Sequence, residues 1–211
     1  MRGGLGLSHV PGVQRLAPPA VMLTEIRTRP PLIVTERLAL RELRLDDARA
    51  VADRAGDKRV ARYLIAVPSP YPVALATRWI VGRLAWWGQG RGLTLAIAPR
   101  EAPDSLIGSV SLRRYARDRR AELGYWLGAE SWGQGYATEA AQALVELGFR
   151  DLALSKIYAQ VLEGNRVSCR VLEKLGMIEE GVRRRHIRKG KRLLDVTLYG
   201  ILKDEWREMP H

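Results

Sequence analysis

The sequence has a single cysteine, Cys169, and three histidines among its 211 residues. One cysteine cannot form an internal disulfide, which excludes a small secreted scaffold held together by disulfides. With His9, His186 and His211 it cannot complete a His/Cys zinc site at any standard spacing. We therefore expect no metal.

Long apolar runs are also absent. No stretch reaches the roughly 18 apolar residues of a transmembrane helix. Residues 3–13 are rich in glycine and are interrupted by Ser8, His9 and Pro11, which does not fit the apolar core of a signal peptide. We therefore expect a cytoplasmic protein that binds no membrane. The composition, 46% hydrophobic and 27% charged, is typical of an ordinary globular protein with a core.

Acidic residues are outnumbered, at 23 Asp+Glu against 35 Lys+Arg, and the formal net charge is +12. Residues 183–192 hold seven Lys/Arg and no acid, and residues 1–31 hold +3, so the rest of the chain carries only +2. The basic segment fits a solvated hairpin turning at Lys189-Gly190-Lys191, a contact with phosphate or an acidic substrate, or a nucleic-acid contact. It has no aromatic side chain to stack on bases, so we do not expect nucleic acid as the direct substrate.

The order of expected elements is β α α β β β α β α β β, which indicates an α+β fold with a mixed central sheet. Residues 1–31 show no period and many Gly and Pro, so we expect a mobile leader, with Met22 as an alternative start, before one domain over 32–211. Asp46 is the expected cap of the first helix, and Leu75, Trp79 and Trp86 are expected to face the core. The pattern predicts strands at 37–43, 93–98, 106–113, 121–127, 157–161, 181–187 and 193–200, and helices at 47–55, from 72 to about 88, 136–149 and 166–175.

The most informative stretch places Gly133 and Gly135 between an expected strand and an expected helix. Such a loop directs backbone N–H groups and the positive helix N-terminus at one point, which suits a phosphate. The dinucleotide fingerprint needs a glycine where Thr138 stands, and the Gly-Lys-Ser/Thr of a P-loop does not occur. By itself the pattern fits a plain tight turn equally well.

The segment from Trp132 to Ala140, WGQGYATEA, resembles the acetyl-CoA pyrophosphate loop of the GNAT superfamily of N-acetyltransferases. More narrowly, it is similar to the branch that acetylates the N-termini of ribosomal proteins. TERLALR at 35–41, LIG at 106–108, AELGY at 121–125, Asn165 with Ser168, and LEKLG at 172–176 follow in that branch's order. The resemblance covers about 35–206 and implies a mostly antiparallel central sheet flanked by helices.

The resemblance also implies roles for particular residues. The amides of Gly133, Gln134, Gly135, Tyr136, Ala137 and Thr138 would hold the pyrophosphate. Backbone groups of Tyr125 and Leu127 would pair with the pantetheine arm in a gap beside their strand, and Asn165 would contact that arm. Trp132 replaces a Gln/Arg of the general superfamily pattern. Because the amides carry the binding, we expect that change to matter little.

The candidate catalytic residues are Ser168 and Glu122. Many superfamily members protonate the leaving thiolate with a tyrosine seven residues after the asparagine, where this chain has Leu172. Ser168 is the best substitute as acid, although a capping or surface serine fits as well. Glu122 could accept a proton through water, although a surface carboxylate also fits. Glu42 is a weaker candidate base, and we expect Glu139 to complement the helix dipole.

The sequence therefore predicts an enzyme that transfers an acetyl group from acetyl-CoA, without a metal, to a primary amine by direct attack in a ternary complex. A protein N-terminus of the ribosomal-protein type is the expected acceptor. The alternatives are a small-molecule amine acetyltransferase, an acetyl-CoA sensor without turnover, and a basic protein associated with ribosomes or RNA. Monomer and homodimer remain equally open.

Overall fold

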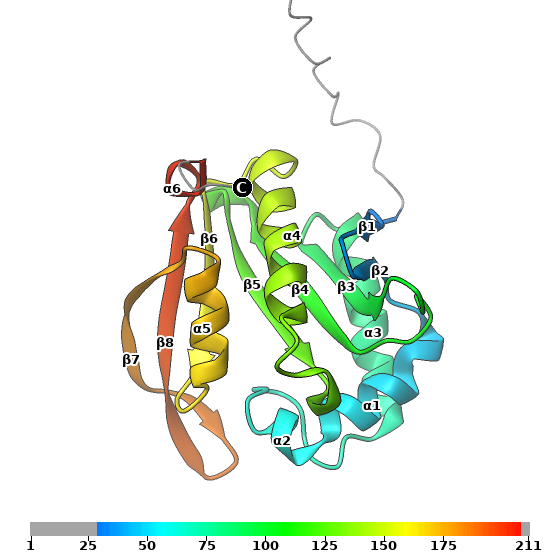
Figure 1. Ribbon diagram of the computed structural model, residues 1–211. Helices are drawn as coiled ribbons and strands as arrows, with labels where there is room; N and C mark the ends of the chain where they lie inside the picture. Colours follow the sequence, from blue (N-terminus) through cyan, green and yellow to red (C-terminus); the bar gives the residue numbers. More distant parts are fainter. Residues whose placement is uncertain (1–28, 208–211) are drawn as a thin grey trace, which may run out of the picture.

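One eight-stranded sheet, in the order β1-β2-β3-β4-β5-β6-β8-β7, organises the molecule. The computed structural model describes residues 29–207 (Figure 1). The predicted leader and alternative start at Met22 fall almost wholly outside these residues, as do His9 and His211. Every neighbouring pair of strands is antiparallel except β5 and β6, which are parallel. This confirms the predicted α+β fold with a mixed, mostly antiparallel sheet.

The elements follow the predicted order. The strands are β1 (Ile33–Val34), β2 (Leu38–Glu42), β3 (Gly92–Pro99), β4 (Gly108–Tyr115), β5 (Arg120–Leu127), β6 (Lys156–Leu162), β7 (Ile178–Lys189) and β8 (Arg192–Leu202). The helices are α1 (Ala48–Gly56), α2 (Lys58–Ala61), α3 (Val73–Gly88), α4 (Tyr136–Arg150), α5 (Arg166–Lys174) and α6 (Lys203–Arg207). The short elements β1, α2 and α6 were not expected, because segments of two to five residues show no period.

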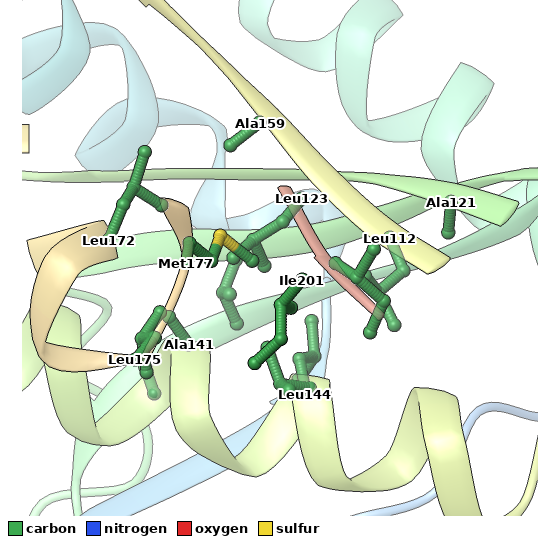
Figure 2. Packing of buried hydrophobic residues seen from close by; sticks show 14 of the residues in the cluster. Leu112, Ala121, Leu123, Ala141, Leu144, Ala159, Leu172, Leu175, Met177 and Ile201 are labelled. Carbon is green, nitrogen blue, oxygen red and sulfur yellow. The ribbon is translucent and has the colours of Figure 1, made fainter. Parts of the chain in front are cut away.

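Helices cover both faces of the sheet. In Figure 1, α4 and α5 lie in front of the strands, and α1 and α3 belong to the other side. On the α4 side, Leu112 and Leu123 from the sheet meet Ala141 and Leu144 from α4 in the main core, as Figure 2 shows. A second, smaller core packs α1 and α3 against Ala96. The amphipathic periods therefore predict the elements, and burial of their apolar faces assembles them.

The helix α3 buries only part of the predicted stripe, because Trp79 packs half-buried against the second core. Ala76 and Ile80 are its fully buried side chains, whereas Leu75 is 38% exposed. Trp86 instead stacks on Arg83, whose guanidinium carbon lies 3.7 Å from the ring centroid. The apolar face that this helix buries therefore centres on Ala76 and Ile80, with Trp79 at its margin.

The cap predicted at Asp46 is also wrong. Residues Leu45–Asp47 form a 3₁₀ turn, and α1 begins after Asp47. The Asp47 carboxylate is instead part of a buried ion pair: its two oxygens accept hydrogen bonds from Arg41 at 2.7 and 2.8 Å. Both side chains are about nine-tenths or more buried. Arg41 also donates to the Pro103 carbonyl at 2.6 Å, so the pair joins β2, α1 and the β3–β4 connection.

Removing one partner of this pair should be costly. Asp47→Ala would leave the Arg41 guanidinium buried without its counter-charge, which typically costs about 3–5 kcal/mol of unfolding free energy. The control Asp104→Ala removes an exposed ion pair with Arg44 and should cost less than about 1 kcal/mol. Urea unfolding measures both. Equal losses in the two variants would contradict a structural role for the buried pair.

Candidate active site

The parallel strands β5 and β6 separate part of the way along. Their pairing runs from Arg120 with Lys156 to Leu123 with Ala159 and goes no further. Beyond that point β5 continues to pair with β4 up to Leu127, and β6 with β8 up to Leu162. The edge of β5 from Gly124 to Leu127 therefore faces a gap and not a strand. Backbone groups at such an edge are available to another extended chain.

A cavity of about 160 Å³ lies at this gap, and we call it the gap cavity. Its walls come from β5, from the loop and helix that follow β5, from the start of α5 and from the segment at the end of α2. The lining residues are Val60, Arg62, Tyr63, Leu64, Tyr125, Trp126, Leu127, Trp132, Ala137, Asn165, Val167, Ser168 and Val171. The fold thus brings together four of the predicted cofactor residues, Tyr125, Leu127, Ala137 and Asn165, with Ser168.

The Tyr125 side chain crosses from β5 to α5. Its hydroxyl lies 2.9 Å from Ser168 Oγ and 3.2 Å from the Ser168 carbonyl oxygen. Burial raises the pKa of Tyr125 above its ordinary value, and the hydrogen bond with Ser168 opposes this only in part. The tyrosine therefore stays protonated, and its O–H donates to the Ser168 carbonyl. Sequence reasoning assigned only the backbone of Tyr125 and missed this contact, which joins residues 43 positions apart.

The glycine loop has the geometry that the motif predicts. Gly133 and Gly135 have φ of +78° and +80°, a left-handed region that glycine adopts without a Cβ penalty. Gly135 caps α4 with no side-chain hydrogen bond, so the first N–H groups of α4, at Tyr136, Ala137 and Thr138, have no partner within the helix. Gln134 lies exposed between the two glycines. Together with the helix dipole, these amides form a site suited to an anion.

Arg37 and Glu139 hold this loop in place. The Glu139 carboxylate accepts hydrogen bonds from the Arg37 side chain at 2.8 Å, from the Arg37 backbone at 2.9 Å and from Thr35 Oγ1 at 2.6 Å. Arg37 also donates to the Gln134 carbonyl at 2.9 Å. Burial raises the pKa of Glu139, but these hydrogen bonds outweigh it and the net shift is downward. Glu139 thus anchors the β1–β2 turn, a role beyond the predicted complement to the dipole.

Two further contacts shape the gap. The Trp132 indole N–H donates to the Leu127 carbonyl at 3.0 Å, so the tryptophan that replaces the family's Gln/Arg closes the loop onto the end of β5. Asn165 caps α5, and its Oδ1 accepts from the Ser168 N–H at 3.3 Å. Its amide NH₂ is the group left to reach a ligand.

Glu122 lies on the other face of the sheet from Ser168. Successive side chains along β5 point to opposite faces of the sheet. Leu123 and Tyr125 point to the α4 side, where Tyr125 meets Ser168, so Glu122 points to the other face. Its carboxylate accepts hydrogen bonds from Gln160 at 3.0 Å and from the Tyr158 hydroxyl at 3.4 Å. Burial, Tyr115 and the Glu122 charge raise the pKa of Tyr158. Glu42, the weaker candidate base, is on β2, with β3 and β4 between it and β5.

A second hollow, of about 500 Å³, opens between the segment after α2 and the tip of the β7–β8 hairpin. We call it the basic hollow, and its lining residues are Lys58, Ala61, Arg62, residues 65–69, Lys189 and Gly190. Arg62 lines both the basic hollow and the gap cavity, so the two adjoin. The hairpin turns at Gly190, as the sequence predicted.

No metal-binding group of three or more His, Cys, Asp or Glu side chains occurs within residues 29–207. Over the same part of the chain, no helix has the length and apolar character needed to cross a bilayer.

Comparisons with known proteins agree with this geometry. The family described as acetyltransferase (GNAT) domain matches residues 37–178. The uncharacterized N-acetyltransferase p20 of Bacillus licheniformis is 32% identical over 176 residues, covering 82% of this chain and 97% of p20. A Bacillus subtilis relative named "Putative ribosomal N-acetyltransferase YdaF" is 29% identical over 176 residues, covering 82% of this chain and 95% of YdaF.

The same fold occurs in a solved structure, that of a GNAT-family acetyltransferase from Bacillus anthracis. It superposes with a TM-score of 0.73 at 26% identity and covers 82% of this chain and 99% of that one. The resemblance that began with the loop at Gly133 and Gly135 thus extends to the whole domain, and the chain belongs to the GNAT superfamily of acetyl-CoA-dependent N-acetyltransferases.

Proposed function

We propose that this acetyltransferase acts on the α-amine of a protein N-terminus, with a ribosomal protein as the candidate acceptor. The observation that carries the proposal is the pair of adjoining cavities. The gap cavity, about 160 Å³, is lined by the residues that would take the pantetheine arm, and it shares Arg62 with the larger basic hollow, which is the space left for an acceptor. An amine at the end of a chain suits this shape. The similarity to YdaF supports the same acceptor class.

Acetyl-CoA would enter from the side of α4 and α5. The amides from Gly133 to Thr138 would hold its pyrophosphate, helped by the helix dipole and by Arg37 beside the loop. The pantetheine arm would run along the open edge of β5, pairing with backbone groups of Tyr125 and Leu127 and with the Asn165 amide. Since the Leu127 carbonyl already accepts from Trp132, the arm would use its second lone pair.

The transfer itself needs two proton movements. The acceptor nitrogen attacks the thioester carbonyl carbon, the C–S bond breaks, and the CoA sulfur leaves as a thiolate. Glu122, on the acceptor face, would take the proton of the amine through water. Ser168, on the CoA face and linked to the protonated Tyr125, would return a proton to the sulfur. Holding the two substrates on opposite faces of the gap supplies the positioning on which direct attack depends.

A thiol-release assay tests the acceptor class. Peptides with a free N-terminus and no lysine should release CoA and gain one acetyl group on the α-amine, as mass spectrometry would show. The matched control is the same peptide with a blocked N-terminus, which should stay inert. Turnover with polyamines, aminoglycosides or amino acids but with no peptide would favour the small-molecule alternative. Acetyl-CoA binding without turnover on any amine would favour a sensor.

The phosphate site is tested by Gly135→Asp. A carboxylate at the N-terminus of α4 would oppose the pyrophosphate, and an L-residue is strained at φ of +80°. We expect the calorimetric Kd of acetyl-CoA to rise by about tenfold or more, since tenfold corresponds to about 1.4 kcal/mol. Gly90→Asp, at φ of +66° with open space around it, is the matched control and should bind normally. An unchanged Kd for Gly135→Asp would remove the loop from the binding site.

The proton transfers are tested by pH–rate profiles. Glu122→Gln should lower kcat by about 10²-fold and abolish the fall in rate on the acidic side, because the base that must be ionised is gone. Glu42→Gln removes a carboxylate on β2 and should leave the profile unchanged.

Within the same assay, Ser168→Ala should lower kcat more than it changes acetyl-CoA affinity, and Ser168→Thr should restore part of the rate. An acidic limb that survives in Glu122→Gln, or a wild-type kcat in Ser168→Ala, would return that residue to a structural role.

A further inference from the structure

The basic hollow carries charge that the protein itself leaves unneutralised. Three cationic side chains, those of Lys58, Arg62 and Lys189, line it, and no acidic side chain does. Within residues 29–207, none of the three forms an ion pair. A cluster of like charges around a concave surface raises the local concentration of an oppositely charged ligand.

The acids nearest the hollow in sequence are already paired elsewhere, and Asp195 on the hairpin accepts a hydrogen bond from the Arg185 backbone N–H at 2.7 Å. Asp57, next to Lys58, pairs with Arg59 at 2.6 Å, and Glu163 pairs with Arg192 at 2.8 Å. The ammonium of Lys189 donates to the Leu64 carbonyl, which ties the hairpin to the segment after α2. Burial lowers the pKa of Lys189, as expected for a cation with no carboxylate beside it. The lining of the hollow therefore offers hydrogen-bond donors to a bound anion and no carboxylate that competes for them.

The hairpin extends this positive surface. Arg183, Arg184 and Arg185 are exposed on β7, whose tip forms one wall of the hollow. Arg62 belongs at once to the hollow and to the gap cavity. An acceptor chain that reaches the thioester from the side of the hollow would therefore place its next residues beside these cations.

We propose that the basic hollow binds carboxylates of the acceptor downstream of the acetylated amine, so that the enzyme selects acidic N-terminal segments. This inference rests on the proposed function, because it takes the acceptor to be a peptide chain. The phosphates of acetyl-CoA share the same anionic chemistry, so the experiment has to separate the two sources of the anion.

The experiment compares peptides that differ only in charge. One set carries Asp or Glu at positions two to five after the same N-terminal residue, and its partner carries Asn or Gln there. We expect the KM of the wild-type enzyme to be about fivefold lower for the acidic peptides, the ratio that one exposed ion pair of about 1 kcal/mol gives. Raising the ionic strength should remove the difference, while kcat stays similar for both sets.

The variants assign the effect to the hollow. Lys58→Glu alone, and Lys58→Glu with Lys189→Glu, should cancel and then reverse the preference for acidic peptides, with the KM of acetyl-CoA unchanged. Arg117→Glu is the matched control, because this exposed arginine lies in the β4–β5 turn, at the opposite end of β5 from Leu127. It should keep the wild-type preference. Thermal melting checks that each variant is folded.

With peptides as acceptors, two outcomes would overturn the inference. Equal KM values for acidic and neutral peptides would leave peptide acetylation intact but remove the selectivity. A rise in the KM of acetyl-CoA in the Lys58 variant would assign the hollow to the phosphates of the cosubstrate.

If no peptide is acetylated, the proposed acceptor class fails, and aspartate is compared with asparagine as acceptor. Equal KM values for aspartate and asparagine would overturn the carboxylate site as well. A preference for aspartate that is lost in Lys58→Glu would retain the hollow as a carboxylate site.

Discussion

The early end of the parallel pairing between β5 and β6 determines the geometry of the candidate active site. Each strand keeps a full antiparallel partner on its outer side, β4 for β5 and β8 for β6, so the gap does not collapse. The glycine loop and the N-terminus of α4 follow directly from the end of β5, and α5 begins just after β6. A single divergence in the sheet thus places an extended backbone edge, a set of free amides and a cavity at one end of the molecule.

Polar contacts between segments far apart in sequence then fix the details. Arg37 and Thr35 hold Glu139, and through it the first turn of α4, while Trp132 closes the loop onto Leu127. Tyr125 joins β5 to Ser168 across the gap. These contacts keep the donors in place before any ligand arrives, which lowers the entropic cost of binding a flexible cosubstrate.

The two faces of the sheet differ in what they offer. The α4 and α5 side presents the anion site, Asn165 and Ser168, whereas the other side presents Glu122 with Tyr158 and Gln160. The segment after α2 and the hairpin add a cationic wall beside the gap. A transfer between two substrates that approach from opposite sides fits this division.

The sequence by itself determined the order of the elements, the mixed sheet and the loop, because periodicity and glycine positions act within a few residues. It did not determine that Trp86 stacks on Arg83, that Asp47 pairs with Arg41, or that Tyr125 reaches Ser168. Nor did it show that β8 lies between β6 and β7, which places the basic hairpin tip beside α2. Only the tertiary structure decided these contacts, because they depend on strand register and on helix packing between segments that share no local pattern.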